Sequence, residues 1–221
     1  MWAKEACSTE MGERMELYFF RHGATKGNLE KRYVGITDEE LTGNAMEQLQ
    51  EYQVKNTDWL SEIEMVVVSP MKRCRQTAEI LFPEKTQWIA EEFRECDFGE
   101  FEYHNFRELD GNPAYQKFID TMGRSGFPKG EDRVSFQKRC VEGLERWMPQ
   151  IMQNQKVAFV VHGGTIMALF DQYSMPHRDY YDWQIGNGEG LVTSLAGIEE
   201  NPDTHRLNWK FIETKRLKNC H

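Results

Sequence analysis

The sequence predicts a three-layer α/β/α domain whose central sheet is mostly parallel and carries helices on both faces. Three short apolar runs lack polar alternation, which is typical of strands buried on both sides of a parallel sheet. These runs are Leu17–Phe20, Met65–Val68 and Val157–Val161. Segments with helical character separate them, and strands that alternate with helices favour an open sheet covered on both faces.

Two helices are expected in the first half of the chain, each introduced by residues that favour a helix start. The segment LTGNAMEQLQEYQ, residues 41–53, contains Thr42, which can cap a helix, and continues in good helix formers. Directly after Val68, Ser69 suits an N-cap and Pro70 suits the first helical position. We therefore expect the second helix to start at the end of its strand.

The second half of the chain continues the alternation. An amphipathic helix is expected between Glu131 and Ile151, where one apolar stripe recurs at helical spacing: Val134, Val141, Leu144, Met148 and Ile151. A buried helix, GTIMALFDQY, is expected after Gly163. Residues 190–198 and 206–217 are predicted to be strands, and the polar alternation of the latter is typical of an edge or half-exposed strand.

Proline and glycine cluster around Gly111–Pro113 and over Gly123–Gly130. We interpret these clusters as loops that frame a small helical insertion over the site, and not as linkers between domains. A single domain is therefore predicted over residues 15–221. Residues 1–14 have no apolar stretch of the kind found in secretion signals, and we expect them to form a flexible extension.

Composition argues against several classes of partner. A chain of 221 residues is long enough to bury one good core. Its formal net charge of −9, with no compensating block of Lys and Arg, argues against nucleic acid as a partner. The apolar runs are far shorter than the roughly 20 residues of a membrane-spanning helix, so no membrane partner is expected. The sequence indicates no oligomeric state.

The five cysteines are odd in number and widely spaced, without a C-x-x-C pair. Neither a disulfide framework nor a structural zinc site is indicated by this pattern. A reducing compartment suits such a chain, and we expect a cytoplasmic protein.

Two of the apolar runs end in a His-Gly pair, and the remaining run leads into a segment that bears an arginine. Arg21 and His22 follow the first run, Arg73 the second, and His162 the third. Ligands of open α/β sheets bind at the carboxyl ends of the strands, so these four side chains are expected to meet in one crevice. Two guanidiniums and two imidazoles suit a phosphate group, and the predicted partner is a small phosphorylated metabolite.

Glycines accompany both histidines: Gly23 follows the first, and Gly163 and Gly164 follow the second. Without a Cβ, the backbone can approach an anion closely and point its N–H groups at it. A metal site is the alternative, since two histidines and a carboxylate can hold a transition metal. The neighbouring guanidiniums make a poor environment for a cation, so no metal is expected. An organic cofactor is not expected either.

Each of these residues taken alone has a simpler explanation, a hydrogen-bonded structural histidine or a solvated arginine. The combination is what favours a site. Together with its surroundings it resembles the histidine phosphatase superfamily, the phosphoglycerate mutase-like branch 1 group. The resemblance runs from about Leu17 to Thr165 and rests on these blocks in the family's order: RHGATKGN, YVGITDEELTGNAMEQ, VVVSPMKRCRQTAEIL, FRECDFGEFE, FPKGEDRVSFQKRC and FVVHGGTI.

The resemblance implies a phosphoglycerate mutase-like fold and a role for each matched position. It implies that His22 is the nucleophile that becomes a phosphohistidine, with Arg21 beside it and Asn28 in contact with the phosphate. Arg73 matches the family's second arginine and Glu95 its proton-donating acid. The remaining matches are the second histidine, His162, and Gly163, which offers a backbone N–H. Spacing alone does not single out Glu95, because an acidic run surrounds it: Glu91, Glu92, Asp97, Glu100 and Glu102.

Membership of this family leaves the reaction open. We expect a phosphatase that hydrolyses a small phosphate monoester, similar to members such as α-ribazole phosphatase. The segment after Glu95 lacks the Leu-Gln-Gly-Leu-type stretch and the long insertion that known mutases of the family share. The alternatives are a cofactor-dependent phosphoglycerate mutase and a non-catalytic module that binds a phosphorylated ligand. The presence of both His22 and Glu95 argues against the second alternative.

The residues that would face a substrate depart from the family pattern. Ala24 stands where Glu or Gln is usual, Lys26 where a bulky residue is usual, and Phe101-Glu102-Tyr103 where Trp-Glu-Gly is common. Aromatic residues are dense in this region: Phe98, Phe101, Tyr103, Phe106 and Tyr115. At such density a core position is the expectation for each of them. If some of them line the mouth of the site, a nucleoside or ring-bearing monoester fits better than a glycerate.

Overall fold

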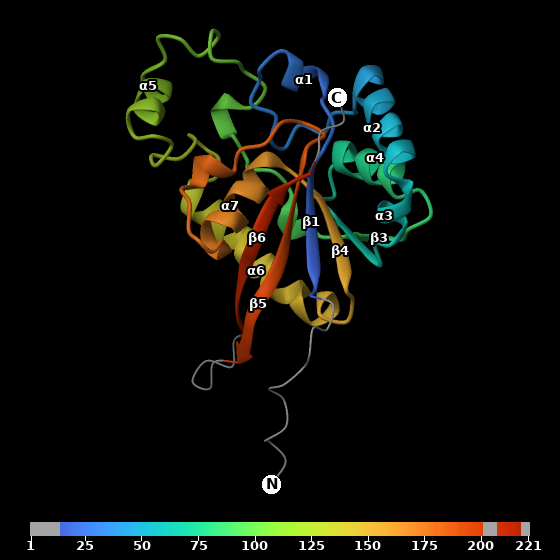
Figure 1. Ribbon diagram of the computed structural model, residues 1–221. Helices are drawn as coiled ribbons and strands as arrows, with labels where there is room; N and C mark the ends of the chain where they lie inside the picture. Colours follow the sequence, from blue (N-terminus) through green and yellow to red (C-terminus); the bar gives the residue numbers. More distant parts are fainter. Residues whose placement is uncertain (1–13, 201–206, 218–221) are drawn as a thin grey trace.

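A computed structural model describes residues 14–200 and 207–217, and its centre is one six-stranded sheet (Figure 1). The strand order is β3-β2-β4-β1-β5-β6. Strands β1 to β4 pair in parallel, whereas β5 runs antiparallel to both β1 and β6. The strands span Glu16–Arg21 (β1), Met65–Val68 (β2), Gln87–Ile89 (β3), Lys156–Val161 (β4), Gly190–Glu200 (β5) and Leu207–Arg216 (β6).

The prediction of a mostly parallel sheet is confirmed, and so are the strands expected in the sequence. Strand β3 was not predicted, because it is only three residues long and lies at the exposed edge of the sheet. Strand β6 forms the other edge, as its alternation indicated. The predicted extension, residues 1–14, lies outside the described residues except for Arg14.

Helices cover both faces of the sheet (Figure 1). Helices α2 (Gly43–Lys55), α3 (Thr57–Ser61) and α4 (Lys72–Leu81) lie on one face. Helices α6 (Arg133–Ile151) and α7 (Gly163–Tyr173) lie on the other. Alternate residues of β1, β2 and β4 point into the two cores, which is why the buried stretches of these three strands are apolar.

Helix α4 begins later than predicted. Its first residue is Lys72 and its N-cap is Met71, so Ser69 does not cap the helix and Pro70 is not its first residue. The Ser69 hydroxyl instead forms a 2.7 Å hydrogen bond with Nε2 of His162 on the neighbouring strand end. The Ser69 side chain therefore forms a hydrogen bond between two neighbouring strand ends instead of the helix cap that the local sequence pattern predicted.

The apolar stripe predicted for α6 is wrong at its start. Val134 is 75% exposed, because Asp132 caps the helix and the first turn faces solvent. The buried face contains Leu144, Met148 and Ile151 as predicted, and it also contains Phe136 and Cys140. The helix therefore packs through a face that starts one half-turn later than the sequence pattern indicated.

The expected helical insertion is present as α5 (Pro113–Asp120), which stands apart from the main layers beside the carboxyl ends of the strands (Figure 1). The remaining short elements are α1 (Lys26–Leu29) and the 3-10 turns η1 (Glu91–Phe93), η2 (Gly99–Phe101) and η3 (Tyr180–Trp183). Among the described residues, no helix is both long and apolar enough to cross a membrane.

Candidate active site

A cavity of about 370 Å³ opens where β1 and β4 end, and most of the predicted site residues meet there. Those that line it directly are Arg21, His22, Asn28, Glu95 and Gly163. The other two, Arg73 and His162, are fully buried behind the cavity wall. The sheet topology therefore brings together residues that are as far apart in the sequence as positions 21 and 163.

His22 is held in one tautomer by its own main chain. Nδ1 lies 2.7 Å from the carbonyl oxygen of Gly23, and a carbonyl oxygen can only accept, so Nδ1 carries the proton. The lone pair is therefore on Nε2. Burial, together with the guanidiniums of Arg73 and Arg21, lowers the pKa of His22 well below its ordinary value of 6.5. The residue is a neutral imidazole with a fixed, unprotonated Nε2.

His162 packs against His22 from the end of β4. Their ring centroids are 5.1 Å apart and the rings are tilted by 67°. The 2.7 Å hydrogen bond with Ser69 holds the imidazole in place, and Nδ1 lies 4.0 Å from Oε2 of Glu95. Burial and the charge of Arg73 lower the pKa of His162 well below 6.5. Ser69 is thus a part of the site that the sequence did not indicate.

Arg73 is a buried cation that is held by backbone carbonyl groups. Its terminal nitrogens donate to the carbonyl oxygens of Gly35 and Thr37, each at 2.8 Å. Within the two described stretches of chain, it forms no ion pair and its Nε has no hydrogen-bond partner. A buried guanidinium without a counter-charge is costly unless an anion binds beside it.

Glu102 braces the segment that holds this arginine. Its Oε1 accepts hydrogen bonds from the backbone N–H groups of Gly35 and Thr37, both at 2.9 Å. The same two residues use their carbonyl groups to hold Arg73. Glu102 therefore acts on the guanidinium through one loop, without contacting the cavity itself.

Arg21 and Gly163 lie against each other at the start of α7. Arg21 donates to the carbonyl oxygen of Ile185 at 2.7 Å, which fixes the direction of its guanidinium. A Cβ on Gly163 would come within 3.3 Å of the Arg21 Nε, so the absence of a side chain makes room for this cation. The N-cap residue of α7, His162, does not cap the helix with its side chain, and the N–H of Gly164 in the first turn is directed at the Glu95 carboxyl group. The start of the helix therefore faces the site with backbone donors, which suits an anion.

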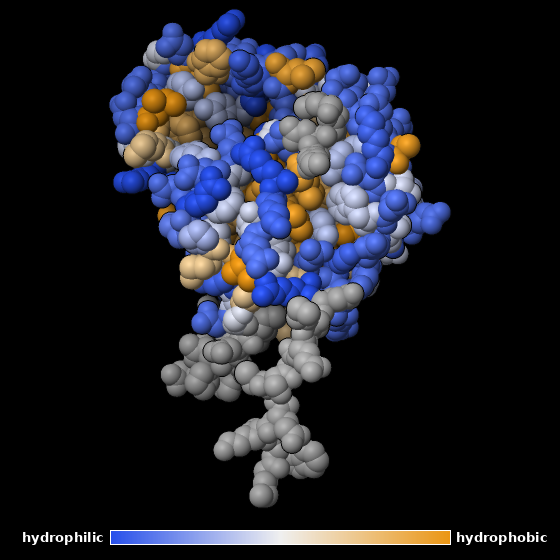
Figure 2. All heavy atoms as spheres, in the orientation of Figure 1, coloured by the Kyte–Doolittle hydropathy of each residue, from blue (hydrophilic) through white to orange (hydrophobic). Residues whose placement is uncertain are grey.

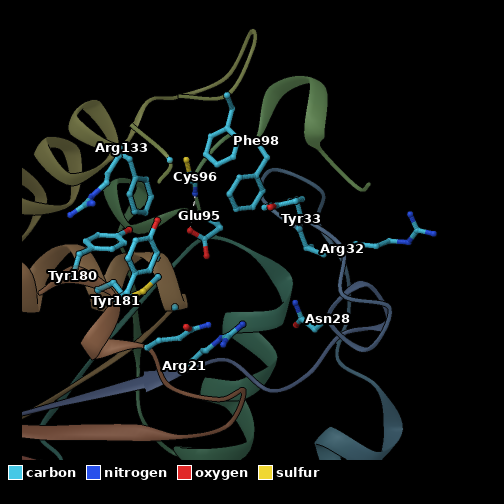
Figure 3. Close-up of a pocket in the computed structure, with 18 of the residues that line it drawn as sticks. Arg21, Asn28, Arg32, Tyr33, Glu95, Cys96, Phe98, Arg133, Tyr180 and Tyr181 are labelled. Atoms are coloured by element: carbon cyan, nitrogen blue, oxygen red, sulfur yellow. Dashed lines mark hydrogen bonds between the residues drawn. The ribbon is translucent and has the colours of Figure 1, made fainter. Parts of the chain in front are cut away.

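The amide of Asn28 is oriented by two hydrogen bonds to its oxygen. Oδ1 accepts from the Thr25 N–H and from Nδ2 of Asn187, both at 3.1 Å. With Oδ1 occupied, Nδ2 is turned towards the cavity (Figure 3). Asn28 thus presents a donor, the type of group that a phosphate oxygen needs.

Glu95 points into the centre of the cavity (Figure 3) and is 9% exposed. Burial raises the pKa of Glu95 above its ordinary 4.5, although the N–H of Cys96 and the guanidiniums of Arg73 and Arg21 oppose the shift. Oε1 accepts the Cys96 N–H at 2.9 Å. A Cβ on Gly164 would lie 2.5 Å from Oε1, so only glycine there leaves space for the carboxyl group.

Aromatic side chains form the outer wall of the cavity, and most of them were not predicted. They are Tyr33, Phe98, Phe118, Phe127, Phe136, Tyr180 and Tyr181. Of the five aromatic residues noted in the sequence, Phe98 lines the cavity, Phe101 is fully buried and Phe106 is 50% exposed. A core position was therefore the right expectation for Phe101 and the wrong one for Phe98 and Phe106. Aromatic density was the only signal in the sequence for this wall.

Among the residues that the structure describes, no group of three His, Cys, Asp or Glu side chains has the arrangement needed to hold a metal ion. Besides Glu95 and the two neutral imidazoles, the polar side chains at the cavity floor are the cations Arg21 and Arg73 and the amide donor of Asn28. This arrangement favours binding of an anion with the size and charge of a phosphate group.

Comparison with known proteins agrees with the geometry. The uncharacterized phosphatase PhoE of Bacillus subtilis is 31% identical over 158 residues, which cover 70% of this chain and 75% of that protein. Phosphoglycerate mutase-like protein 4 of Arabidopsis thaliana is 25% identical over 163 residues, 71% of this chain and 70% of its own. The crystal structure of the alpha-ribazole phosphatase from Shigella flexneri has a TM-score of 0.72 at 22% identity, covering 88% of this chain and 95% of that one.

The structural likeness shows that the predicted phosphoglycerate mutase-like α/β fold is right. The sequence profile of the histidine phosphatase superfamily (branch 1) matches residues 17–210, which include every site residue described above and all of the sheet except the first residue of β1 and the second half of β6. This chain therefore belongs to the histidine phosphatase superfamily, branch 1.

Proposed function

We propose that the protein is a phosphatase that hydrolyses small phosphate monoesters through a phosphohistidine on His22, with Glu95 as the proton donor. The observation that carries the proposal is the hydrogen bond from Nδ1 of His22 to the carbonyl of Gly23. It fixes an unprotonated Nε2 at the floor of a cavity rich in cationic and donor groups. A neutral imidazole in that position is a nucleophile.

In the first step Nε2 of His22 attacks phosphorus in line with the leaving oxygen. A P–N bond forms and the P–O bond to the alcohol breaks. Glu95 gives its proton to the departing oxygen, so the alcohol leaves neutral and Glu95 becomes a carboxylate. Arg21, Arg73 and Asn28 are the groups proposed to stabilise the charge on the transferring phosphoryl oxygens.

In the second step the Glu95 carboxylate takes a proton from water. The water oxygen attacks phosphorus, the P–N bond breaks, and inorganic phosphate and neutral His22 result. His162 is proposed to support the phosphoryl group through its contact with His22, and the Gly163 N–H through its place at the start of α7. No step of this scheme uses a metal ion or an organic cofactor.

The raised pKa of Glu95 supports its assignment as the acid. A general acid must be protonated before the reaction, and burial favours the neutral carboxyl group at this position. Its Oε2 also lies 4.0 Å from the ring of His162, so the acid and the two histidines occupy one site. The other acidic residues of the surrounding run do not line the cavity.

The test is release of inorganic phosphate from a panel of monoesters in EDTA, comparing the wild type with His22→Ala. His104, an exposed histidine, provides the matched control as His104→Ala. We expect turnover without added metal, no turnover with His22→Ala, and unchanged turnover with the control. Most of the activity surviving in His22→Ala would overturn the proposal.

A mutase is the second candidate, because a relative that is 25% identical carries a phosphoglycerate mutase-like name. A mutase returns the phosphoryl group to a bound glycerate, so it would interconvert phosphoglycerates when the bisphosphate is added and release little phosphate. Binding of phosphate without either reaction would indicate the non-catalytic module.

A further inference from the structure

The outer half of the cavity differs in chemistry from its floor. Around the mouth the lining side chains are mainly rings, contributed by separate parts of the chain. Tyr33 follows α1, Phe98 precedes η2, Phe118 lies on α5, and Tyr180 and Tyr181 belong to η3. Figure 2 shows apolar side chains gathered in the region around α5. The leaving group of a bound ester must lie against this wall.

The rings on one side of the mouth pack against one another and form a continuous surface. Phe98 and Phe127 meet edge to face with centroids 4.9 Å apart, and Phe118 lies 4.7 Å from Phe127. Tyr33 adds a further edge-to-face contact with Phe98 at 5.3 Å. Each of these rings is only partly buried, so part of its surface remains available to a ligand. Aromatic surfaces of this kind bind flat or bulky apolar groups.

Besides Arg21 at the floor, two arginines line the outer half of the cavity, Arg32 and Arg133, and neither presents a free cation to it. Arg32 donates to the carboxylates of Glu30 and Glu108, and to the carbonyl oxygen of Tyr103. Its guanidinium points away from the cavity (Figure 3).

Arg133 is engaged in a similar way. Its guanidinium lies over the ring of Tyr180 at 4.0 Å and is 3.8 Å from the Asp171 carboxylate. In Figure 3 it turns outward from the cavity past Tyr180. A carboxylate on the leaving group would therefore lose its hydration without gaining a free cationic partner in the outer half of the cavity.

We infer that the preferred substrates are monoesters whose alcohol carries an apolar ring, and not phosphorylated hydroxy acids. This inference rests on the proposed function, because it assigns the leaving-group side of the same site. The phosphate end would bind to the cations and donors of the floor, and the ring would stack on the aromatic wall. The cavity, at about 370 Å³, lies within the range that holds drug-sized ligands.

Binding of non-hydrolysable phosphonates tests this inference independently of turnover. The dissociation constants of 2-phenylethylphosphonate, propylphosphonate and 3-phosphonopropionate are measured by calorimetry on the full chain. All three share the phosphonate group, so differences report the rest of the molecule. We expect the phenyl compound to bind at least tenfold more tightly than the other two. Equal affinities, or tightest binding of the carboxylate compound, would overturn the inference.

Variants identify the wall as the source of the preference. Phe98→Leu keeps an apolar side chain but removes a ring, and should weaken the phenyl compound about five- to tenfold while leaving propylphosphonate unchanged. Phe106→Leu is the matched control, because Phe106 is half exposed and does not line the cavity. Tyr181→Ala is a second variant of the aromatic wall, and it leaves the core intact because Tyr181 is 52% exposed.

The two proposals fail in different ways. Tight, ring-selective binding without phosphate release from 2-phenylethyl phosphate would refute the phosphatase, while the aromatic wall would stand as a ring-binding surface. Phosphate release from 3-phosphoglycerate together with tight binding of 3-phosphonopropionate would support the phosphatase and refute the inference.

Discussion

Replacing Gly164 with alanine should displace the proposed proton donor without touching any charged group. The added Cβ would lie 2.5 Å from Oε1 of Glu95, whereas ordinary contact begins near 3.4 Å, so the carboxyl group must retreat by about 0.9 Å. A misplacement of about 1 Å costs on the order of 10² in rate when geometry limits the reaction. Gly164 does not have a positive φ, so alanine introduces no backbone strain.

The assay compares the kcat of Gly164→Ala on an alkyl phosphate and on nitrophenyl phosphate. A nitrophenolate departs without needing a proton, so its hydrolysis should fall much less than that of the alkyl ester. Gly43→Ala is the control, because Gly43 also lies in the first turn of a helix and an added Cβ would meet nothing within 4 Å. Equal losses on both substrates, or a loss below threefold on the alkyl ester, would refute Glu95 as the donor at this position.

Three further outcomes are expected. With an alkyl ester as substrate, kcat/KM should decline towards alkaline pH as Glu95 loses its proton, at a pH above the ordinary glutamate pKa of 4.5. The residual activity of Glu95→Gln should not show this decline in a pH–rate profile. Glu102→Ala should release the loop that holds the Arg73 guanidinium, which should lower kcat/KM by a factor on the order of 10² and weaken inhibition by phosphate. Glu100→Ala is the control, because Glu100 forms a surface ion pair, and it should change neither quantity. The free energy of unfolding should fall as pH drops below about 6.5, because His22 and His162 are neutral when folded and become protonated when unfolded. Urea titrations at several pH values should show a decrease of about 1.4 kcal/mol per pH unit for each histidine, and in His22→Ala the contribution of one histidine to this decrease should be absent.

The main strands could be predicted because burial on both faces leaves a strong signal, a run of apolar residues with no polar interruption. Such a run is absent from β3, whose residues are partly or largely exposed, so nothing in Gln87–Ile89 indicated a strand. The start of α4 was misplaced for a different reason. Ser69 has good local capping chemistry, but its hydroxyl contacts His162, a residue 93 positions away in the sequence.

The site was predictable only where topology decides it. Arg21, His22 and His162 follow strand ends, and the rule for open sheets places strand ends together. Glu95 follows a 3-10 turn in an acidic run, and what distinguishes it from Glu91 is burial, a property of the folded chain. For the same reason, Phe98 and Phe101 look alike in the sequence although one faces the cavity and the other the core.

The backbone carbonyl groups that hold Arg73 have a consequence for the stability of the protein in different buffers and for its catalytic turnover. Backbone oxygens orient this cation but do not neutralise it, and no carboxylate of the described residues forms an ion pair with it, so an oxyanion that reaches the site supplies a counter-charge. Such an ion binds the folded chain in preference to the unfolded one, and at a hundred times its dissociation constant it adds about 2.7 kcal/mol to the free energy of unfolding. Phosphate, sulfate or vanadate in a buffer should therefore raise the melting temperature. In a phosphatase the same affinity acts on the product, so departure of inorganic phosphate competes with the transfer step for control of the rate.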